Sequence, residues 1–186
     1  MKPIFKVSAL LAVLASPVAS AVEYHTVLPA QSSINFEFRQ MGVPVKGGFK
    51  RFTTQMLFDP AKPGAARAQI EIDLASIDAG SPEADEESAG RLWFNRSAYP
   101  KATFVSSQIR ALGNNRYEMR GTLTLKGRSR EMSVPVTFAP GKAAAIFDGG
   151  FTLKRLDFGI GEGMWADVAT VANEVQVNFR IAATGK

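Results

Sequence analysis

Apolar and polar residues alternate with a period of two along most of this 186-residue chain. In one run, Ile34, Phe36 and Phe38 alternate with polar residues at the positions between them. A period of two places successive side chains on opposite faces of a strand, so each run predicts a β-strand with one dry and one wet face. The clearest runs are residues 34–39, 69–74, 117–125, 132–138 and 175–181, and weaker strands are expected around residues 23–28, 49–59, 102–109 and 145–154.

Turn-forming residues separate these strands. Residues 113–115 (Gly-Asn-Asn) tolerate positive φ and predict a hairpin loop, and residues 126–128 (Lys-Gly-Arg) predict the next one. One segment has helical signals instead, because Ser81 suits an N-cap, Pro82 suits the first turn and acidic residues follow. We expect a short helix over residues 82–90, with its acidic run on a solvated face.

The number and kind of these elements predict the fold class. About eight or nine antiparallel strands, one short helix and no helical crossover indicate an all-β chain that forms a closed barrel or a sandwich. With no internal repeat and no flexible linker, one domain is expected. The inward strand face is rich in Phe, Val, Ile and Met, and the chain has 13 Phe. A barrel of eight strands either fills its interior or holds one small ligand, which here would be apolar.

The N-terminus has the features of a signal peptide. Lys2 and Lys6 form a short positive region, and residues 7–15 are apolar apart from one serine. Residues 19–21 (Ala-Ser-Ala) then match the small residues of a cleavage site. The order of these three features predicts a cleaved signal peptide over residues 1–21.

Removal of this segment changes what the charge implies. The whole chain has a formal net charge of +5, and loss of two lysines lowers it to +3 for the 165 residues that remain when 21 are removed from 186. So weak a positive charge argues against nucleic acid as a partner. The domain over residues 22–186 has no apolar run long enough to span a bilayer and no Cys for a lipid anchor. We expect a periplasmic protein without a stable membrane anchor.

The chain carries little that indicates catalysis. It has no Cys and a single His, which excludes thiol catalysis, Cys-ligated metals and multi-histidine metal sites. Residues 159–163 (Gly-Ile-Gly-Glu-Gly) lack the spacing of a nucleotide loop, and strand-like sequence follows where a helix would be needed. We therefore predict no catalytic residue, no metal ligand and no cofactor.

The charged residues around this glycine cluster allow two interpretations. An Arg155–Asp157 pair would pin a loop at the mouth of the barrel. Alternatively, Asp157 or Glu162 would do acid–base chemistry on a bound ligand, if burial separated their pKa values. The first interpretation is favoured, because the sequence offers no nucleophile or histidine nearby.

Four segments, taken in order, resemble a known family. They are residues 48–52 (Gly-Phe-Lys-Arg-Phe), residues 92–104 from Leu-Trp-Phe to Tyr-Pro-Lys-Ala-Thr-Phe, residues 121–127 (Gly-Thr-Leu-Thr-Leu-Lys-Gly) and residues 155–161 (Arg-Leu-Asp-Phe-Gly-Ile-Gly). Together they resemble the YceI family of exported, polyisoprenoid-binding, lipocalin-like proteins, over essentially residues 22–183. The resemblance implies an antiparallel lipocalin-like barrel around a long apolar tunnel, which binds isoprenoid or quinone-like lipids without catalysis.

The resemblance also implies which residues meet the ligand. Those that match the family's motifs are Phe49, Phe52, Trp93, Phe94, Phe104 and Phe158. We add Phe36 and Phe38, from the apolar face of their strand, and Trp165, which follows the glycine cluster. The aromatic residues near loops have a second interpretation, as small cores that close the ends of the barrel. The chain departs from the family at residues 39–42 and 89–91, so the headgroup stays open.

The predicted function is that of a periplasmic carrier for a long isoprenoid lipid, a polyprenoid or a quinone, held inside the barrel. Two alternatives stay open. One is an enzyme that acts on a lipid through Asp157 or Glu162, and the other is an envelope interaction protein with a filled barrel. The oligomeric state also stays open, a homodimer being one alternative.

Overall fold

The computed structural model describes residues 22–185, so the predicted signal peptide lies outside the described residues. The described part of the chain contains eleven β-strands and one α-helix, α1 (Pro82–Ala89). The strands are β1 (Tyr24–Val27), β2 (Ser33–Gln40), β3 (Val43–Phe49), β4 (Phe52–Leu57), β5 (Arg67–Asp73), β6 (Ile77–Asp78), β7 (Lys101–Gly113), β8 (Arg116–Leu125), β9 (Arg128–Ala139), β10 (Ala145–Lys154) and β11 (Glu174–Gly185).

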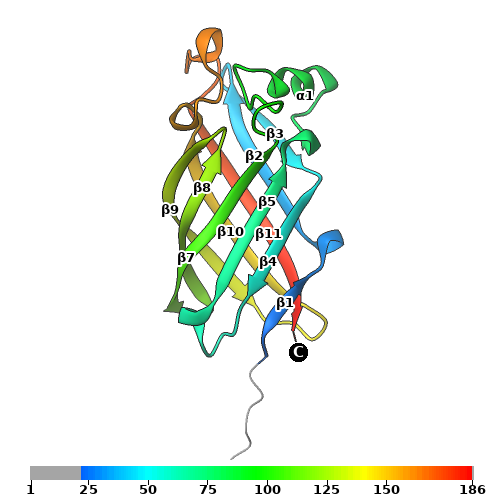
Figure 1. Ribbon diagram of the computed structural model, residues 1–186, viewed down its shortest axis with the longest axis vertical. Helices are drawn as coiled ribbons and strands as arrows, with labels where there is room; N and C mark the ends of the chain where they lie inside the picture. The colour runs from blue at the N-terminus through cyan, green and yellow to red at the C-terminus, as the bar shows by residue number, and fades with distance from the viewer. Residues whose placement is uncertain (1–21, 186) are drawn as a thin grey trace, which may run out of the picture.

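The strands form one antiparallel sheet that curls into a barrel (Figure 1). Hydrogen-bonded neighbours run in the order β4-β5-β7-β8-β9-β10-β11-β2-β3-β6, and β1 pairs with the end of β11. Tyr24 of β1 then exchanges two backbone hydrogen bonds with Phe58, at 2.8 and 3.0 Å, just after β4. Through β1, these bonds connect β4, at one end of the strand order, to the end of β11. The predicted all-β, lipocalin-like barrel with one short helix is therefore confirmed.

The structure contains two strands, β3 and β6, that were not expected as separate elements. Residues 49–59 were expected to form one strand, but the chain turns at residues 50–51, between β3 and β4. The sequence of β3 does not predict a strand, because it contains one Pro and two Gly, which are uncommon in strands. Gly47 lies opposite Phe36 on β2, and the Phe36 ring occupies the space that a Cβ at Gly47 would need. Glycine is thus required here by a cross-strand ring, which no local pattern shows.

The predicted turns and helix are where the sequence placed them. Residues 114, 115, 126 and 127 all have positive φ, in the loops between β7 and β8 and between β8 and β9. Helix α1 begins after Ser81, whose Oγ accepts a hydrogen bond from the backbone N–H of Ala84 at 3.2 Å. Among residues 22–185, no helix combines the length and the apolar character that crossing a bilayer requires.

The two ends of the barrel differ. Helix α1 and residues 155–173 lie at one end, which we call the loop end, and β1 lies at the other, the base (Figure 1). Five buried aromatic rings fill the base, with centroids of contacting rings 5.0 to 6.5 Å apart. They belong to Tyr24, Phe58, Tyr117, Phe138 and Phe147. Such tilted and edge-on contacts make a tight plug, so this end of the barrel is closed.

Candidate functional site

An apolar cavity of about 480 Å³ occupies the loop end of the barrel. This volume falls within the range of small-molecule sites. Its wall consists of inward-facing side chains from seven long strands, together with α1, β6 and the loops above them. The apolar lining residues are Ile34, Phe36, Phe38, Val45, Phe49, Ile72, Leu74, Ile77, Ala79, Ala84, Trp93, Phe94, Ala102, Leu123, Leu125, Phe151, Leu153, Ile160, Trp165, Val171, Val175 and Val177.

The structure brings six of the nine predicted ligand-binding residues to this large cavity. They are Phe36, Phe38, Phe49, Trp93, Phe94 and Trp165. The other three, Phe52, Phe104 and Phe158, are not among the residues that line it and pack in or against the hydrophobic core. Contact of any of these residues with a ligand stays a prediction.

Phe104 is packed beneath the large cavity, next to residues that line it. Its ring lies over Gly121 of β8, in the space that a Cβ there would occupy. Phe104 pairs with Ile70 on one side and Leu123 on the other. Leu123 lines the large cavity, whereas Ile70 lines a second cavity nearer the base. Phe104 therefore lies at the level that separates the two.

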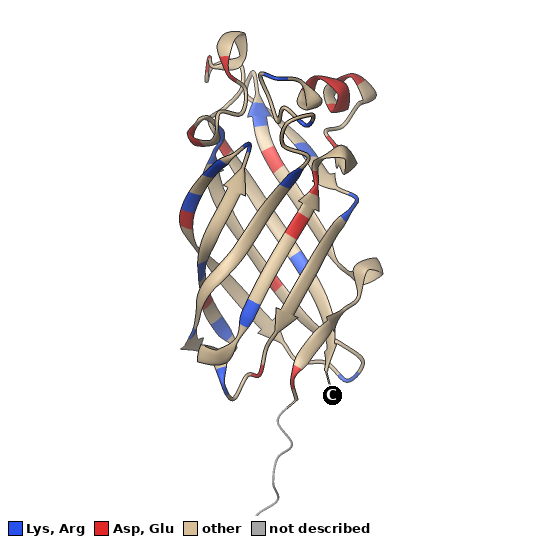
Figure 2. Ribbon diagram, viewed as in Figure 1, with Lys and Arg blue, Asp and Glu red and all other residues tan. Residues whose placement is uncertain are grey.

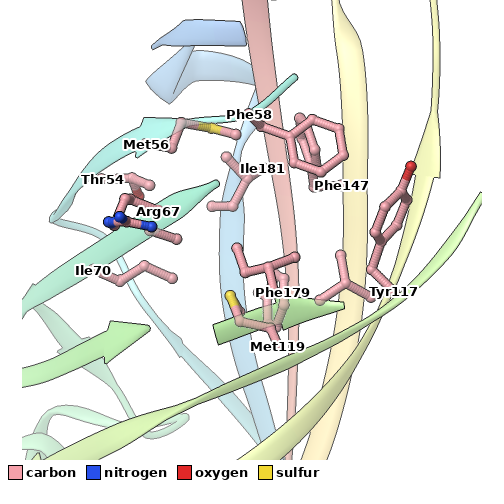
Figure 3. A pocket seen from close by; sticks show the side chains of 13 residues that line it. Thr54, Met56, Phe58, Arg67, Ile70, Tyr117, Met119, Phe147, Phe179 and Ile181 are labelled. Carbon is pink, nitrogen blue, oxygen red and sulfur yellow. The ribbon is translucent and has the colours of Figure 1, made fainter. Parts of the chain in front are cut away.

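The second cavity is small, about 50 Å³, and shares no lining residue with the large one. Figure 3 shows Met56 and Ile70, from β4 and β5, on one side, and Met119 and Phe179, from β8 and β11, on the other. The Phe179 ring covers a glycine on β10, just as the Phe104 ring covers one on β8. The interior is thus hollow at the loop end and divided lower down, whereas the family resemblance implied one long tunnel.

Two indole rings meet at the mouth of the large cavity. Trp93 follows α1 in sequence and Trp165 lies on the facing loop, and their ring centroids are 5.6 Å apart. The Trp165 Nε1 also donates a hydrogen bond to the Glu87 Oε1 on α1, at 2.9 Å. The loop and the helix are therefore joined across the mouth by one aromatic contact and one hydrogen bond.

The loop that carries Trp165 is held by a buried arginine. Arg155 is 2% exposed, and its guanidinium donates five hydrogen bonds of 2.7 to 3.0 Å, all to backbone carbonyl oxygens. Within the described residues it has no carboxylate partner, so the expected Arg155–Asp157 pair is wrong. Burial lowers the pKa of Arg155, and the carbonyl dipoles offset that cost. The acceptors are Ile160, Gly161, Trp165, Val171 and Ala172.

The sequence pattern of the YceI-like domain matches residues 25–183. The chain belongs to the YceI-like family. A UPF0312 protein of Vibrio cholerae is 30% identical over 169 residues, which cover 86% of this chain and 89% of that protein.

Solved structures share the fold of this YceI-like chain. The crystal structure of Burkholderia cenocepacia BcnA is 44% identical and has a TM-score of 0.83, over 85% of this chain and 99% of that one. A polyisoprenoid binding domain from Saccharophagus degradans, implicated in plant cell wall breakdown, is 17% identical with a TM-score of 0.68, over 90% and 100% of the two chains. At that identity the second likeness concerns the fold alone.

The carboxylates of the catalytic alternative lie away from the cavity of this YceI-like barrel. Neither Asp157 nor Glu162 is among the residues that line it. Glu162 instead binds two cations of the β8–β9 hairpin, with Lys126 Nζ at 3.0 Å and Arg128 Nη2 at 2.9 Å. Lys126 also donates to the carbonyl oxygen of Gly159. Glu162 therefore ties the loop of residues 155–173 to a neighbouring hairpin.

The rim of the cavity includes polar residues that the sequence analysis did not assign to the site. Glu83 and Glu87 are exposed on α1 and border the cavity, together with Gln40 and the buried Ser88. Figure 2 shows that α1 is rich in acidic residues. We expected a solvated helix face, and this face is the rim of the site. The spacing of four between the two glutamates was the available signal, since residues four apart share a helix face. Among residues 22–185, no group of three or more potential ligands is placed to hold a metal ion.

Acid should loosen the loop that Glu162 holds. Hydrogen bonds and ion pairs with Lys126 and then Arg128 hold the pKa of Glu162 below its ordinary value of about 4.5. A carboxylate with a lowered pKa stabilises the fold above its ordinary pKa, and this contribution is lost as pH falls through the lower, folded-state value. We expect hydrogen-exchange protection factors of residues 159–165 to fall as the pH drops below about 4.5. Glu162→Gln should remove this pH dependence, and an unchanged dependence in that variant would contradict the role of Glu162.

Proposed function

We propose that this protein binds a long apolar isoprenoid lipid in the large cavity and acts as a carrier or sequestering protein. The observation that carries this proposal is an almost wholly hydrocarbon wall around about 480 Å³ of space. Such a wall gains about 0.8 kcal/mol for each CH₂ group it buries. The solved relative described as a polyisoprenoid binding domain, which has the same fold, supports this ligand class.

The size of the cavity suggests how much of a lipid tail it takes. An apolar cavity of about 150 Å³ holds one benzene ring, so the large cavity has room for roughly three such six-carbon groups. That corresponds to about three to four isoprene units of five carbons each. Because Phe104 and Phe179 lie beneath the cavity, a longer tail has to project from the mouth.

The proposed setting is the periplasm, and the proposed lipid is a polyprenoid or a quinone. The periplasmic setting rests on the signal-peptide features of residues 1–21. A quinone with an isoprenoid tail joins an apolar chain to a compact ring, and the two indoles at the mouth offer aromatic surfaces for that ring. A carrier with such a site would keep the tail out of water between two places of use.

Binding of a series of prenyl benzoquinones with increasing tail length tests this function. Trp93 and Trp165 at the mouth report binding through their fluorescence. We expect Kd to fall with each added isoprene unit and to level off at about two to three units, because the quinone ring takes the space of one six-carbon group and the tail fills the rest. Organic extraction and mass spectrometry of the protein from its native host should identify an isoprenoid lipid. Absence of lipid from repeated extracts, together with no uptake of any member of the series, would reject the proposal.

A further inference from the structure

The mouth of the cavity contains a hydrogen-bond donor without an acceptor. Trp93 lines the cavity, and its Nε1 is buried with no hydrogen-bond partner among the described residues. A buried indole N–H normally has a partner, and an unpaired donor is unfavourable because its contact with water is lost. A ligand that fills this cavity is the natural source of the missing acceptor.

The neighbouring indole of Trp165, unlike that of Trp93, has a hydrogen-bond partner. The Trp165 ring lies 5.6 Å away, and its Nε1 already donates to Glu87 at 2.9 Å. The polar group of Trp165 is therefore satisfied within the protein, whereas the N–H of Trp93 has no partner among the described residues.

The charges around Trp93 restrict which acceptor fits. The Arg155 guanidinium lies 5.8 Å from the centre of the Trp93 ring, which favours a partial negative charge nearby. All five of its N–H groups already bind backbone carbonyls, so it offers positive charge but no free donor. A phosphate needs several donors and would also approach the carboxylates of Glu83 and Glu87 on the rim. A neutral carbonyl oxygen needs only one donor.

We propose that Trp93 selects the headgroup of the ligand by donating its Nε1–H to a neutral carbonyl oxygen, such as that of a quinone. This inference rests on the proposed function and adds the chemistry and the orientation of the head. Trp93 lies at the loop end, so the head lies under the mouth, between Arg155 and Trp165. The tail then extends toward Ile34 and Phe151, which line the same cavity from β2 and β10.

Two probes that differ only in the carbonyl groups test the role of Trp93. One is a benzoquinone with a tail of three isoprene units, and the other is benzene with the same tail. Trp93→Phe keeps an aromatic ring and removes the N–H. We expect this variant to bind the quinone about fivefold to tenfold more weakly, the effect of one lost hydrogen bond, and to bind the benzene probe as wild type does. Trp165→Phe is the matched control, since its N–H is already paired, and it should affect both probes alike.

The carbonyl stretching frequency of the bound quinone gives a second measurement. It should be lower in wild type than in Trp93→Phe, because a hydrogen bond weakens the C=O bond. Equal effects of Trp93→Phe on both probes, or an unchanged stretch, would overturn the role of Trp93 and leave lipid binding standing. A tenfold preference of wild type for the matching prenyl diphosphate, lost in Trp93→Phe, would overturn the neutral headgroup. Failure of wild type to bind either probe would instead overturn the proposed function.

Discussion

Arg155→Met should lower the free energy of unfolding by about 3–5 kcal/mol, as expected when at least two buried acceptors lose their hydrogen bonds. Methionine has a similar length and no donors, so the five carbonyl oxygens that Arg155 binds lose their partner. At least some of them stay buried, and each buried unpaired group costs about 1–3 kcal/mol. Chemical denaturation monitored by circular dichroism measures the change.

The same substitution should destabilise the loop of residues 155–173 more than it destabilises the strands of the barrel. All five carbonyls belong to residues 160–172, so hydrogen-exchange protection should be lost there first. Arg155→Lys keeps the charge but has too few donors, and it should recover only part of the stability. Arg67→Met is the control, because that guanidinium is exposed although it also binds two carbonyls, and it should change stability by no more than about 0.5 kcal/mol. A loss below about 1 kcal/mol in Arg155→Met would contradict the importance of this network.

Ala102→Trp should nearly abolish lipid binding while the protein stays folded. Ala102 lies on β7, is 3% exposed and lines the large cavity, so a new indole would enter space that a ligand needs. Exclusion of one five-carbon isoprene unit removes about 4 kcal/mol of burial energy, at about 0.8 kcal/mol for each carbon. That corresponds to a Kd higher by about a thousandfold. Titration with the three-unit prenyl benzoquinone measures it.

The matched control for this substitution lies on the same strand. Val105 is 46% exposed and alternates with the buried Ala102 and Phe104 on β7, so Val105→Trp adds an indole to the outer face of the barrel and should leave Kd unchanged. The cavity of about 480 Å³ has room for an indole, so Ala102→Trp should not cause the strain that follows overpacking of a filled core. A folded Ala102→Trp protein with Kd within about threefold of wild type would show that the ligand binds elsewhere.

Residues that line the cavity and residues that fill the core have the same sequence signal, an apolar position in an alternating strand. Phe38 and Phe104 both occupy apolar positions of predicted strands, but Phe38 lines the large cavity and Phe104 is packed beneath it. A glycine on the neighbouring strand does not explain the difference, since the Phe104 ring lies over Gly121 and the Phe36 ring lies over Gly47, yet Phe36 lines the cavity. An alternating pattern reports which face of a strand is dry. It does not report whether the dry face surrounds space or fills it.

The loop at the mouth shows that the sequence also did not predict the hydrogen-bond partners of a buried side chain. From the sequence, Asp157 was the natural partner for Arg155, because it is the nearest acid. In the structure Arg155 binds backbone carbonyls instead, including that of Ala172, seventeen residues away. Carbonyl oxygens are present at every residue, so no residue pattern marks the ones that a fold will gather around a cation.

The sequence by itself determined the family, the barrel, the turns at positive φ and the helix that begins after Ser81. These features depend on local periodicity, on turn and capping residues and on motifs, all of which can be recognised in the amino-acid sequence. Only the tertiary structure decided that the loop end is hollow, that Arg155 is held by carbonyls and that Trp93 has an unpaired donor at the mouth. Those properties depend on distances between residues far apart in sequence, which packing alone sets.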